Sequence, residues 1–166
     1  MPARQLHRRH LLLSGAAVAL TACSPAPSGA QESRYANSAF RRISDAEWRR
    51  RLPGLSYQVL RHEATERPFT SALNDEHRRG VFHCRGCDLA LFRSEWKFDS
   101  GTGWPSFYRV IDGAVGTKRD FAIGIPRTEY HCARCLGHHG HLFEDGPRPT
   151  GLRYCNNGVA LVFRPA

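Results

Sequence analysis

The stretch VFHCRGC, residues 81–87, places a Cys-x-x-Cys pair directly after a short run of strand-forming residues, and TEYHCARC, residues 128–135, repeats this arrangement. Four thiolates on two such turns can form a closed tetrahedral site of the kind that holds a structural zinc ion. Gly86 and Gly137 are expected to supply the tight turns that the two pairs need. The spacing therefore predicts one zinc ion with the ligands Cys84, Cys87, Cys132 and Cys135.

Two other uses of the four cysteines stay open from the spacing alone. In an exported protein they can form disulfides, and a single Cys-x-x-Cys pair can act as a redox centre. Neither pair lies in the βαβ pattern that is typical of thioredoxin-like proteins, and two such pairs together favour a metal. A metal site is therefore the preferred interpretation, with zinc ahead of iron.

Short strand-like segments separated by glycine and proline dominate the chain after residue 80. Several short strands with little helix indicate a small, mainly β domain of antiparallel strands, whose modest core a bound metal would help to stabilise. We expect strands at residues 81–84, 89–92, 107–111, 121–125, 128–132 and 159–163.

The region before these strands is expected to contain one short helix. Ser44 and Glu47 form a capping-box pattern that predicts a helix at residues 43–52, ended by Pro53-Gly54. Residues 55–64 are assigned to a further strand, and residues 67–80 to a polar loop with a turn of helix.

The N-terminal segment has the features of an export signal. Arg8-Arg9 precede an apolar run at residues 11–20 that is too short to span a bilayer. The paired arginines resemble a twin-arginine signal, and LTAC, ending at Cys23, resembles a lipobox, in which the cysteine becomes the lipidated N-terminus. The alternative is an ordinary secretory peptide in which Cys23 is incidental.

These features predict three segments: a signal peptide with lipobox at residues 1–23, a flexible linker at 24–39 and a folded domain at 40–166. We therefore expect an exported protein, periplasmic and anchored to a membrane through a lipid on Cys23.

The positive charge of the chain is scattered. The formal net charge is +9, or about +6 without the three arginines of residues 1–22. Arginines cluster at Arg41-Arg42 and Arg49–Arg51, which is typical of a solvated face rather than a nucleic-acid interface. We expect a monomer without a nucleic-acid partner.

Cys155 remains once the two cysteine pairs and Cys23 are set aside. An unpaired thiol of this kind is intermolecular, reactive, or buried and inert. Arg153 lies two residues before it, so on a strand the two side chains share one face, where the guanidinium is expected to lower the pKa of the thiol. This neighbour favours a reactive thiol.

Two nearby stretches supply further residue types with chemical roles. GHHGHLF, residues 137–143, carries His138, His139 and His141, which can act as general acids or as zinc ligands. Because four cysteines already suffice for a metal, the catalytic role is preferred. DSGTGWPSF, residues 99–107, displays Trp104 in a glycine-rich loop, where it suits the wall of a shallow apolar pocket better than a core.

Four blocks of the sequence resemble, in the same order, the signature blocks of the peptide-methionine (R)-S-oxide reductases of the MsrB type. The blocks are KFDSGTGWPSF (97–107), RTEYHCARC (127–135), GHHGHLFEDGP (137–147) and PTGLRYCNN (149–157). The resemblance implies a β-tent fold of two small antiparallel sheets with a structural zinc. It also implies reduction of the R epimer of methionine sulfoxide, with Trp104 matching the residue that packs on the substrate methyl group.

The resemblance implies roles for residues around the unpaired thiol as well. Cys155 matches the nucleophile, which attacks the sulfoxide and is left as a sulfenic acid. His138 and His141 match the pair that binds and protonates the sulfoxide oxygen. Arg153 and Asn157 match polar residues beside the nucleophile, and the two cysteine pairs match the zinc ligands.

The sequence departs from the family pattern near these residues. Many members carry a second cysteine that resolves the sulfenic acid as a disulfide, and Thr102 occupies that position here. We therefore expect no intramolecular disulfide, and regeneration by a thioredoxin-like protein or a small thiol. Asn156, Gly158 and His139 also differ from the usual residues, which bears on rate and substrate preference rather than on reaction type.

Two rival functions stay open. A zinc-stabilised interaction module would not need Cys155 or His141, although both are present. A thiol–disulfide oxidoreductase would need a second redox cysteine near Cys155, and the sequence offers none besides the two pairs and Cys23.

Overall fold

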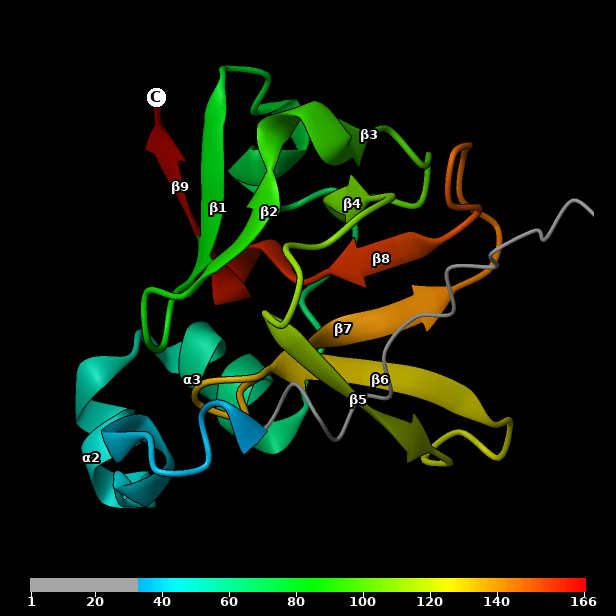
Figure 1. Cartoon of the computed structure of the whole chain (residues 1–166). Helices are drawn as coiled ribbons and strands as arrows, with labels where there is room; N and C mark the ends of the chain where they lie inside the picture. Colours follow the sequence, from blue (N-terminus) through cyan, green and yellow to red (C-terminus); the bar gives the residue numbers. More distant parts are fainter. Residues whose placement is uncertain (1–32) are drawn as a thin grey trace, which may run out of the picture.

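The computed structural model describes residues 33–166, so the predicted signal peptide, Cys23 and most of the predicted linker lie outside the described residues. In the described part of the chain, nine strands form two antiparallel sheets (Figure 1). The smaller sheet has the order β2-β1-β9, and its strands are β1 (Gly80–Cys84), β2 (Ala90–Arg93) and β9 (Leu161–Pro165). The larger sheet has the order β3-β4-β8-β7-β6-β5. Its strands are β3 (Lys97–Phe98), β4 (Ser106–Phe107), β5 (Val115–Asp120), β6 (Arg127–Cys132), β7 (His138–Phe143) and β8 (Arg153–Asn156). The predicted fold class is confirmed.

An aromatic cluster between the two sheets forms the centre of the core. Phe82 and Phe92 of the smaller sheet pack on Phe107 of the larger one, with ring centroids 5.0 and 4.2 Å from it. Tyr130 and Tyr154, whose ring centroids lie 5.3 Å apart, extend the cluster along the larger sheet. All five side chains are buried. Because large rings in stacked and edge-to-face contact bury extensive apolar area, this cluster holds the inner faces of the sheets together.

Within residues 33–166, the helices α2 and α3 precede the strands. The predicted capped helix is confirmed by α2 (Asp45–Arg51), where the hydroxyl of Ser44 accepts a hydrogen bond from the backbone N–H of Glu47. The next helix, α3 (Gly54–His62), begins directly after Pro53.

The strand predicted at residues 55–64 is wrong, because this segment forms α3. Leu55, Tyr57 and Val59 alternate with polar residues as in a strand, but Leu55 is exposed. The buried positions are instead Ser56, Tyr57, Val59 and Leu60. That spacing is one face of a helix, which packs against β7 and the segment after β8.

Short 3₁₀ turns connect the elements. They are η1 (Ala39–Arg42), η2 (Ala72–Asp75), η3 (Ser94–Trp96) and η4 (Gly158–Ala160). The turn of helix expected within residues 67–80 is confirmed by η2. Tyr35, near the end of the predicted linker, packs against the hydrophobic core. Within residues 33–166, the helices are all too short or too polar to cross a membrane.

Four of the expected strands coincide closely with β1, β2, β6 and β9, and two do not. Residues 107–111 are strand only at Phe107, which belongs to β4. Residues 121–125 form the turn between β5 and β6, with Phe121, Ile123 and Ile125 exposed. The strand that pairs with β6 is instead the preceding β5, a polar strand at the edge of the sheet. Its backbone pairs with β6 from Val115 to Asp120.

Candidate active site and metal centre

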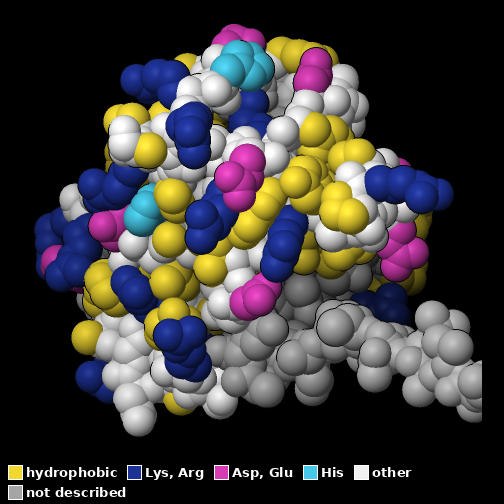
Figure 2. All heavy atoms as spheres, turned by 45° about the horizontal axis from the view of Figure 1, so that its top comes forward, with side chains coloured by type: hydrophobic (Ala, Val, Ile, Leu, Met, Phe, Trp, Pro, Cys, Tyr) yellow, Lys and Arg dark blue, Asp and Glu magenta, His cyan; other side chains and the backbone are white. Residues whose placement is uncertain are grey.

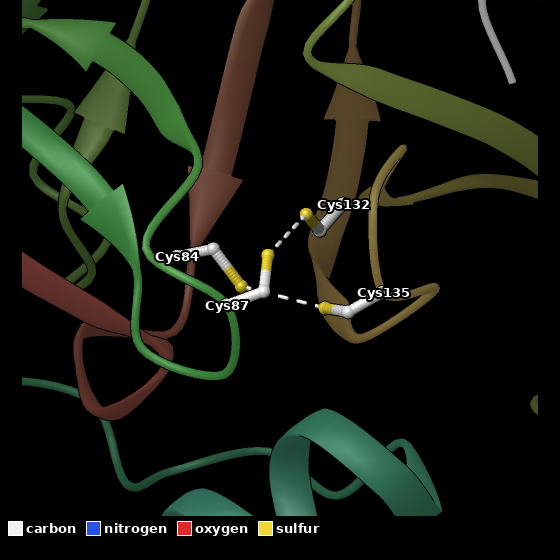
Figure 3. Close-up of side chains that lie close together, drawn as sticks. All are labelled: Cys84, Cys87, Cys132 and Cys135. Atoms are coloured by element: carbon white, nitrogen blue, oxygen red, sulfur yellow. Dashed lines mark hydrogen bonds between the residues drawn. The ribbon is translucent and has the colours of Figure 1, made fainter. Parts of the chain in front are cut away.

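The four paired cysteines come together at the end of the molecule where the two sheets meet. Cys84 and Cys87 lie on the β1–β2 turn, and Cys132 and Cys135 lie on the β6–β7 turn, so the pairs face each other across the sheets (Figure 3). All four are buried free thiols with sulfur atoms within 4.8 Å of one another.

The spacing of these sulfur atoms fits zinc. The Cys84 and Cys135 sulfurs are 3.6 Å apart, and the Cys87 and Cys132 sulfurs are 3.4 Å apart. A tetrahedral zinc ion with Zn–S bonds of about 2.3 Å requires sulfur–sulfur distances of about 3.8 Å. The donor set and geometry therefore support a closed structural site, and no histidine joins the cluster among residues 33–166.

Gly86 lies in the turn between Cys84 and Cys87, as predicted, whereas Gly137 follows the turn at residues 133–135. The left-handed backbone positions of this site are Asp88 and Leu136, each with φ of 60° directly after a cysteine pair. Neither glycine has a positive φ. Gly137 is needed for a different reason: a Cβ there would lie 2.9 Å from the Leu60 side chain and 3.3 Å from the Cys135 sulfur.

Cys155 lies on β8, which occupies a central position in the six-stranded sheet. It pairs with Ser106 of β4 on one side and with His141 of β7 on the other, and His141 pairs in turn with Glu129 of β6. Directly paired residues of antiparallel strands place their side chains on the same face, about 4.5–5.5 Å apart at Cβ. The register therefore sets Glu129, His141, Cys155 and Ser106 in one row across the sheet, which we call the catalytic row.

A bulge in β7 brings a second histidine to this face. The pairing shifts between Tyr130–Gly140 and His131–His138, so β7 carries one extra residue, His139. A bulge re-aims side chains that strict alternation would place on the opposite face. His138 and His141 thus lie together, with ring centroids 5.6 Å apart. His139 instead lies in the core, stacked on Tyr130 at 6.4 Å.

Glu129 holds the second histidine in place. Its carboxylate, which is 1% exposed, lies 2.8 Å from Nδ1 of His138 and 3.1 Å from Nδ1 of His131. Burial opposes ionisation of Glu129, but hydrogen bonds to the two histidines outweigh it and lower its pKa to about 2. The ionised carboxylate directs Nδ1–H of His138 toward itself. Nε2 of His138 has no hydrogen-bond partner within the described part of the chain, so a bound ligand can use it.

His141 has a separate carboxylate. Its Nε2 lies 2.6 Å from Asp120, which also accepts a hydrogen bond from Arg127 at 2.5 Å. Burial lowers the pKa of His141, although the hydrogen bond to Asp120 partly offsets this effect. The imidazole of His141 is therefore largely neutral near pH 7.

The central strands approach so closely that only glycine fits at one position of β7. A Cβ on Gly140 would lie 1.9 Å from the carbonyl oxygen of Cys155. The absence of a side chain there lets β7 and β8 pair between the two histidines and the thiol.

A pocket of about 150 Å³ opens over the β7 side of Cys155. Trp104 forms one wall, as predicted, and His141, Phe143, Asn157 and Cys155 also line it. This wall of indole and phenyl rings suits a small apolar group, while the thiol and imidazole supply the reactive and polar atoms.

Glu66 connects the pieces of this pocket. Its carbonyl oxygen accepts a hydrogen bond from the Trp104 indole at 3.1 Å, and its N–H donates to the side chain of Asn157 at 2.9 Å. The buried carboxylate accepts hydrogen bonds from the N–H groups of Gly158 and Val159. Burial raises the pKa of Glu66, and these two backbone donors offset part of the rise. Glu66 therefore fixes the wall of the pocket relative to the segment after Cys155.

The thiol of Cys155 is partly buried, and this burial raises its pKa. The charge of Arg153 and a hydrogen bond from Thr102 act in the opposite direction but do not reverse the rise. Arg153 therefore acts on the pKa of the thiol in the predicted direction, but burial outweighs its effect. Arg153 itself forms a double hydrogen bond with Asp145, 2.7 Å from each oxygen, and its guanidinium lies 4.3 Å from the centre of the Phe143 ring.

Two unusual residues behind the thiol face each other in the core. The Nδ1 atom of His139 and the side-chain oxygen of Asn156 are 3.4 Å apart, and both residues are fully buried. Burial lowers the pKa of His139 to about 4, so its imidazole stays neutral. These two departures from the family pattern therefore contact each other in the core, and Asn156 also lines the pocket whereas His139 does not.

The structure thus brings together the sequence-predicted residues Cys155, His138, His141, Trp104, Arg153 and Asn157. Four acidic residues that position them escaped the sequence reasoning: Glu66, Asp120, Glu129 and Asp145. The one available signal was Glu129 two residues before His131, because a carboxylate beside an imidazole on a strand often marks a pair.

Basic side chains are dispersed rather than gathered into one patch. On the face shown in Figure 2, lysine and arginine side chains alternate with acidic and apolar ones. Several arginines are engaged locally, as in the ion pairs of Arg50 and Arg51 with Glu47. On this face, therefore, the basic side chains do not form a single patch.

Comparison with known proteins agrees with this site. The chain matches the SelR domain over residues 52–165. A peptide methionine sulfoxide reductase MsrB from Pseudomonas putida (strain W619) is 57% identical over 120 residues, covering 72% of this chain and 90% of the relative. One from Bradyrhizobium diazoefficiens is 51% identical over 123 residues, covering 74% and 88%. The chloroplastic peptide methionine sulfoxide reductase B1 of Arabidopsis thaliana is 46% identical over 154 residues, covering 92% and 75%. The chain therefore belongs to the MsrB family of peptide methionine sulfoxide reductases, which are oxidoreductases.

Proposed function

We propose that this protein reduces the R epimer of methionine sulfoxide in peptides and proteins to methionine, with Cys155 as the nucleophile. The observation that carries the proposal is the catalytic row, in which His141 and Cys155 are direct cross-strand partners. A thiol, the imidazole of His141 and an aromatic wall meet at one pocket, and the imidazole of His138 lies behind His141 with ring centroids 5.6 Å apart. These are the groups that sulfoxide reduction needs.

The reaction balances without an external proton. The sulfur of Cys155 attacks the sulfoxide sulfur, the sulfur–oxygen bond of the substrate breaks, and the oxygen passes to Cys155. The thiol proton passes to that oxygen, so a thiol and a sulfoxide become a sulfenic acid and methionine. Cys155 is oxidised by two electrons and the substrate sulfur is reduced by two.

The histidines carry this proton. At rest the thiol is protonated because burial raises the pKa of Cys155, and His141 is largely neutral because burial lowers its pKa. His141 can accept the thiol proton as the thiolate forms and pass it on to His138, whose ring centroid lies 5.6 Å away. His138, whose Nδ1 side faces the Glu129 carboxylate, can then present a proton at Nε2 to the sulfoxide oxygen. Glu129 stabilises the imidazolium form that this transfer requires.

Trp104 and Asn157 fix the substrate and the nucleophile. The indole of Trp104, held by the carbonyl of Glu66, offers an apolar face to the S-methyl group. Asn157 donates a hydrogen bond to the backbone carbonyl of His139 at 2.9 Å and so ties the segment after Cys155 to β7. Both contacts keep the thiol and the pocket wall at a fixed separation.

The four-cysteine site holds zinc in this proposal. Cys84 and Cys87 belong to the turn of the smaller sheet, and Cys132 and Cys135 to a turn of the larger sheet. A bound zinc ion supplies a cross-link between the two sheets, and the reaction itself takes place at Cys155.

Regeneration of Cys155 uses an external thiol, from a thioredoxin-like protein or a small molecule. Thr102, next to the thiol, cannot form a disulfide. The other four cysteines among residues 33–166 form the metal cluster. The predicted signal and lipobox support an exported, membrane-anchored monomer that repairs oxidised proteins in the cell envelope.

Turnover of defined epimers tests the function. A peptide carrying either the R or the S sulfoxide is incubated with the protein and dithiothreitol, with Cys155→Ser as the control. We expect methionine from the R epimer only, and none from the control. Absence of turnover by zinc-loaded, folded protein would favour the interaction module instead.

A further inference from the structure

A second hollow lies near Cys155 and is separate from the substrate pocket. It has a volume of about 370 Å³ and is formed by the β3–β4 and β7–β8 connections. Ser100, Thr102, Pro147 and Arg153 are among its lining residues, and it shares none with the substrate pocket. Along β8, Arg153 lines this hollow and Asn156 lines the substrate pocket, so Cys155 lies between the two cavities in the strand.

Cys155 does not line the second hollow itself, but two residues that do are neighbours of its thiol. Thr102 and Arg153 line the hollow, and both also interact with the Cys155 thiol. The Thr102 hydroxyl is linked through Ser100 to Ser106, with oxygen–oxygen distances of 2.8 Å at each step. Ser106 is the strand partner of Cys155, so a hydroxyl chain lines the sheet on this side of the thiol.

The chemistry of the second half of the cycle distinguishes the two sides. In the proposed function, the oxygen on Cys155 comes from the substrate and therefore faces the substrate pocket. Displacement at a divalent sulfur atom is in line, so the entering thiol approaches from the side opposite to the departing oxygen. The substrate pocket extends from Cys155 toward Asn156 and Asn157, so the opposite side is toward Arg153, where the second hollow opens.

We propose that the reducing thiol reaches the Cys155 sulfenic acid through this second hollow, so that substrate and reductant use separate entrances. This inference rests on the proposed function. A thiol attacks the sulfenic sulfur, a sulfur–sulfur bond forms, the sulfur–oxygen bond breaks, and the hydroxyl leaves with the thiol proton as water. A second thiol then attacks the mixed disulfide, releasing the reductant as a disulfide and Cys155 as a thiol.

The charged residues of the second hollow suit an incoming thiolate. Arg153 is 9% exposed in its side chain and adjoins both the hollow and the sulfur atom, so its guanidinium can stabilise an incoming thiolate. Asp145 engages Nε and Nη2 of this guanidinium and fixes its plane. The shared requirement is a thiolate, whether it belongs to a small molecule or to a protein.

Two substitutions to tryptophan, one at the edge of each cavity, test whether substrate and reductant use different entrances. Pro147 is an exposed residue lining the second hollow, and Thr65 is an exposed residue lining the substrate pocket. Pro147→Trp and Thr65→Trp are made in the full chain, and zinc content and thermal unfolding establish that each folds. The first half-reaction is the methionine formed from the R-sulfoxide peptide without reductant, measured by rapid quench. The second is the loss of sulfenic acid on adding dithiothreitol or thioredoxin, measured by dimedone labelling.

We expect Pro147→Trp to slow the second half-reaction at least tenfold with both thiols and to change the first less than twofold. Thr65→Trp should do the reverse. The proposal is overturned if Pro147→Trp leaves the second half-reaction at the wild-type rate, slows both halves equally, or slows thioredoxin alone. It is also overturned if Thr65→Trp slows the second half. If the wild-type protein forms no methionine in the first half-reaction, the proposed function itself fails.

Discussion

Replacing Glu129 by glutamine tests the role of the buried carboxylate most directly. Glutamine keeps the size of the side chain but removes the negative charge 2.8 Å from His138. A hydrogen bond to a charged group contributes about 1.5–3 kcal/mol, whereas a neutral one contributes about 1 kcal/mol. The change therefore removes about 1–2 kcal/mol from the imidazolium form of His138, which corresponds to a rate loss of about 5- to 30-fold.

The assay is the single-turnover formation of methionine from an R-sulfoxide peptide, because this step needs the proton and is independent of the reductant. Glu95→Gln, at an exposed position in η3, is the matched control and should keep the wild-type rate. Zinc content and thermal unfolding exclude a folding defect. A folded, metallated Glu129→Gln variant with the wild-type rate would refute the assignment of His138 as the proton donor.

Three further changes have defined outcomes. Gly140→Ala should lower the free energy of unfolding in urea by about 1–3 kcal/mol and the single-turnover rate more than tenfold, because the new Cβ would lie 1.9 Å from the Cys155 carbonyl oxygen. The control Gly54→Ala, whose Cβ would have no atom within 4 Å, should change neither quantity. Cys132→Ala should abolish zinc binding and lower the midpoint of thermal unfolding by more than about 10 °C, because a structural zinc ion contributes its binding energy to folding. An unchanged unfolding midpoint, measured by circular dichroism, would contradict the structural role of the metal. The first half-reaction should accelerate as pH rises from 7 toward 9, since burial raises the pKa of the Cys155 thiol and the thiolate fraction grows with pH. Arg153→Met removes a positive charge that lowers the pKa of the Cys155 thiol. In this variant, the increase in rate with pH, measured by stopped flow, should therefore shift to higher pH.

The metal ligands could be predicted from the sequence because their chemistry is local. A Cys-x-x-Cys turn carries its geometry within four residues, and two turns complete one tetrahedral site. Cys155 could be singled out because the pairs accounted for the other thiols. By contrast, Asp88 and Leu136 adopt a left-handed backbone although neither is glycine, so this conformation could not be predicted from residue type.

The catalytic row could not be derived from local pattern. His141 and Glu129 become neighbours of Cys155 only through strand register, and the bulge at His139 decides which histidine faces the pocket. The same non-local pairing explains the error at residues 121–125. Their apolar side chains suggest a strand, yet the hydrogen bonds are made by the polar residues of β5, whose register with β6 overrides the composition.

The central position of β8 also determines when the protein can become reactive during its synthesis. Strand β8 follows every strand of its own sheet in the chain, and it joins β4 to β7. Until the ribosome has released this segment, the larger sheet consists of two separate parts. The residues that surround the thiol are then not held in fixed positions relative to one another. A nascent chain therefore displays neither a completed pocket nor a tuned nucleophile, and both arise together when β8 is inserted.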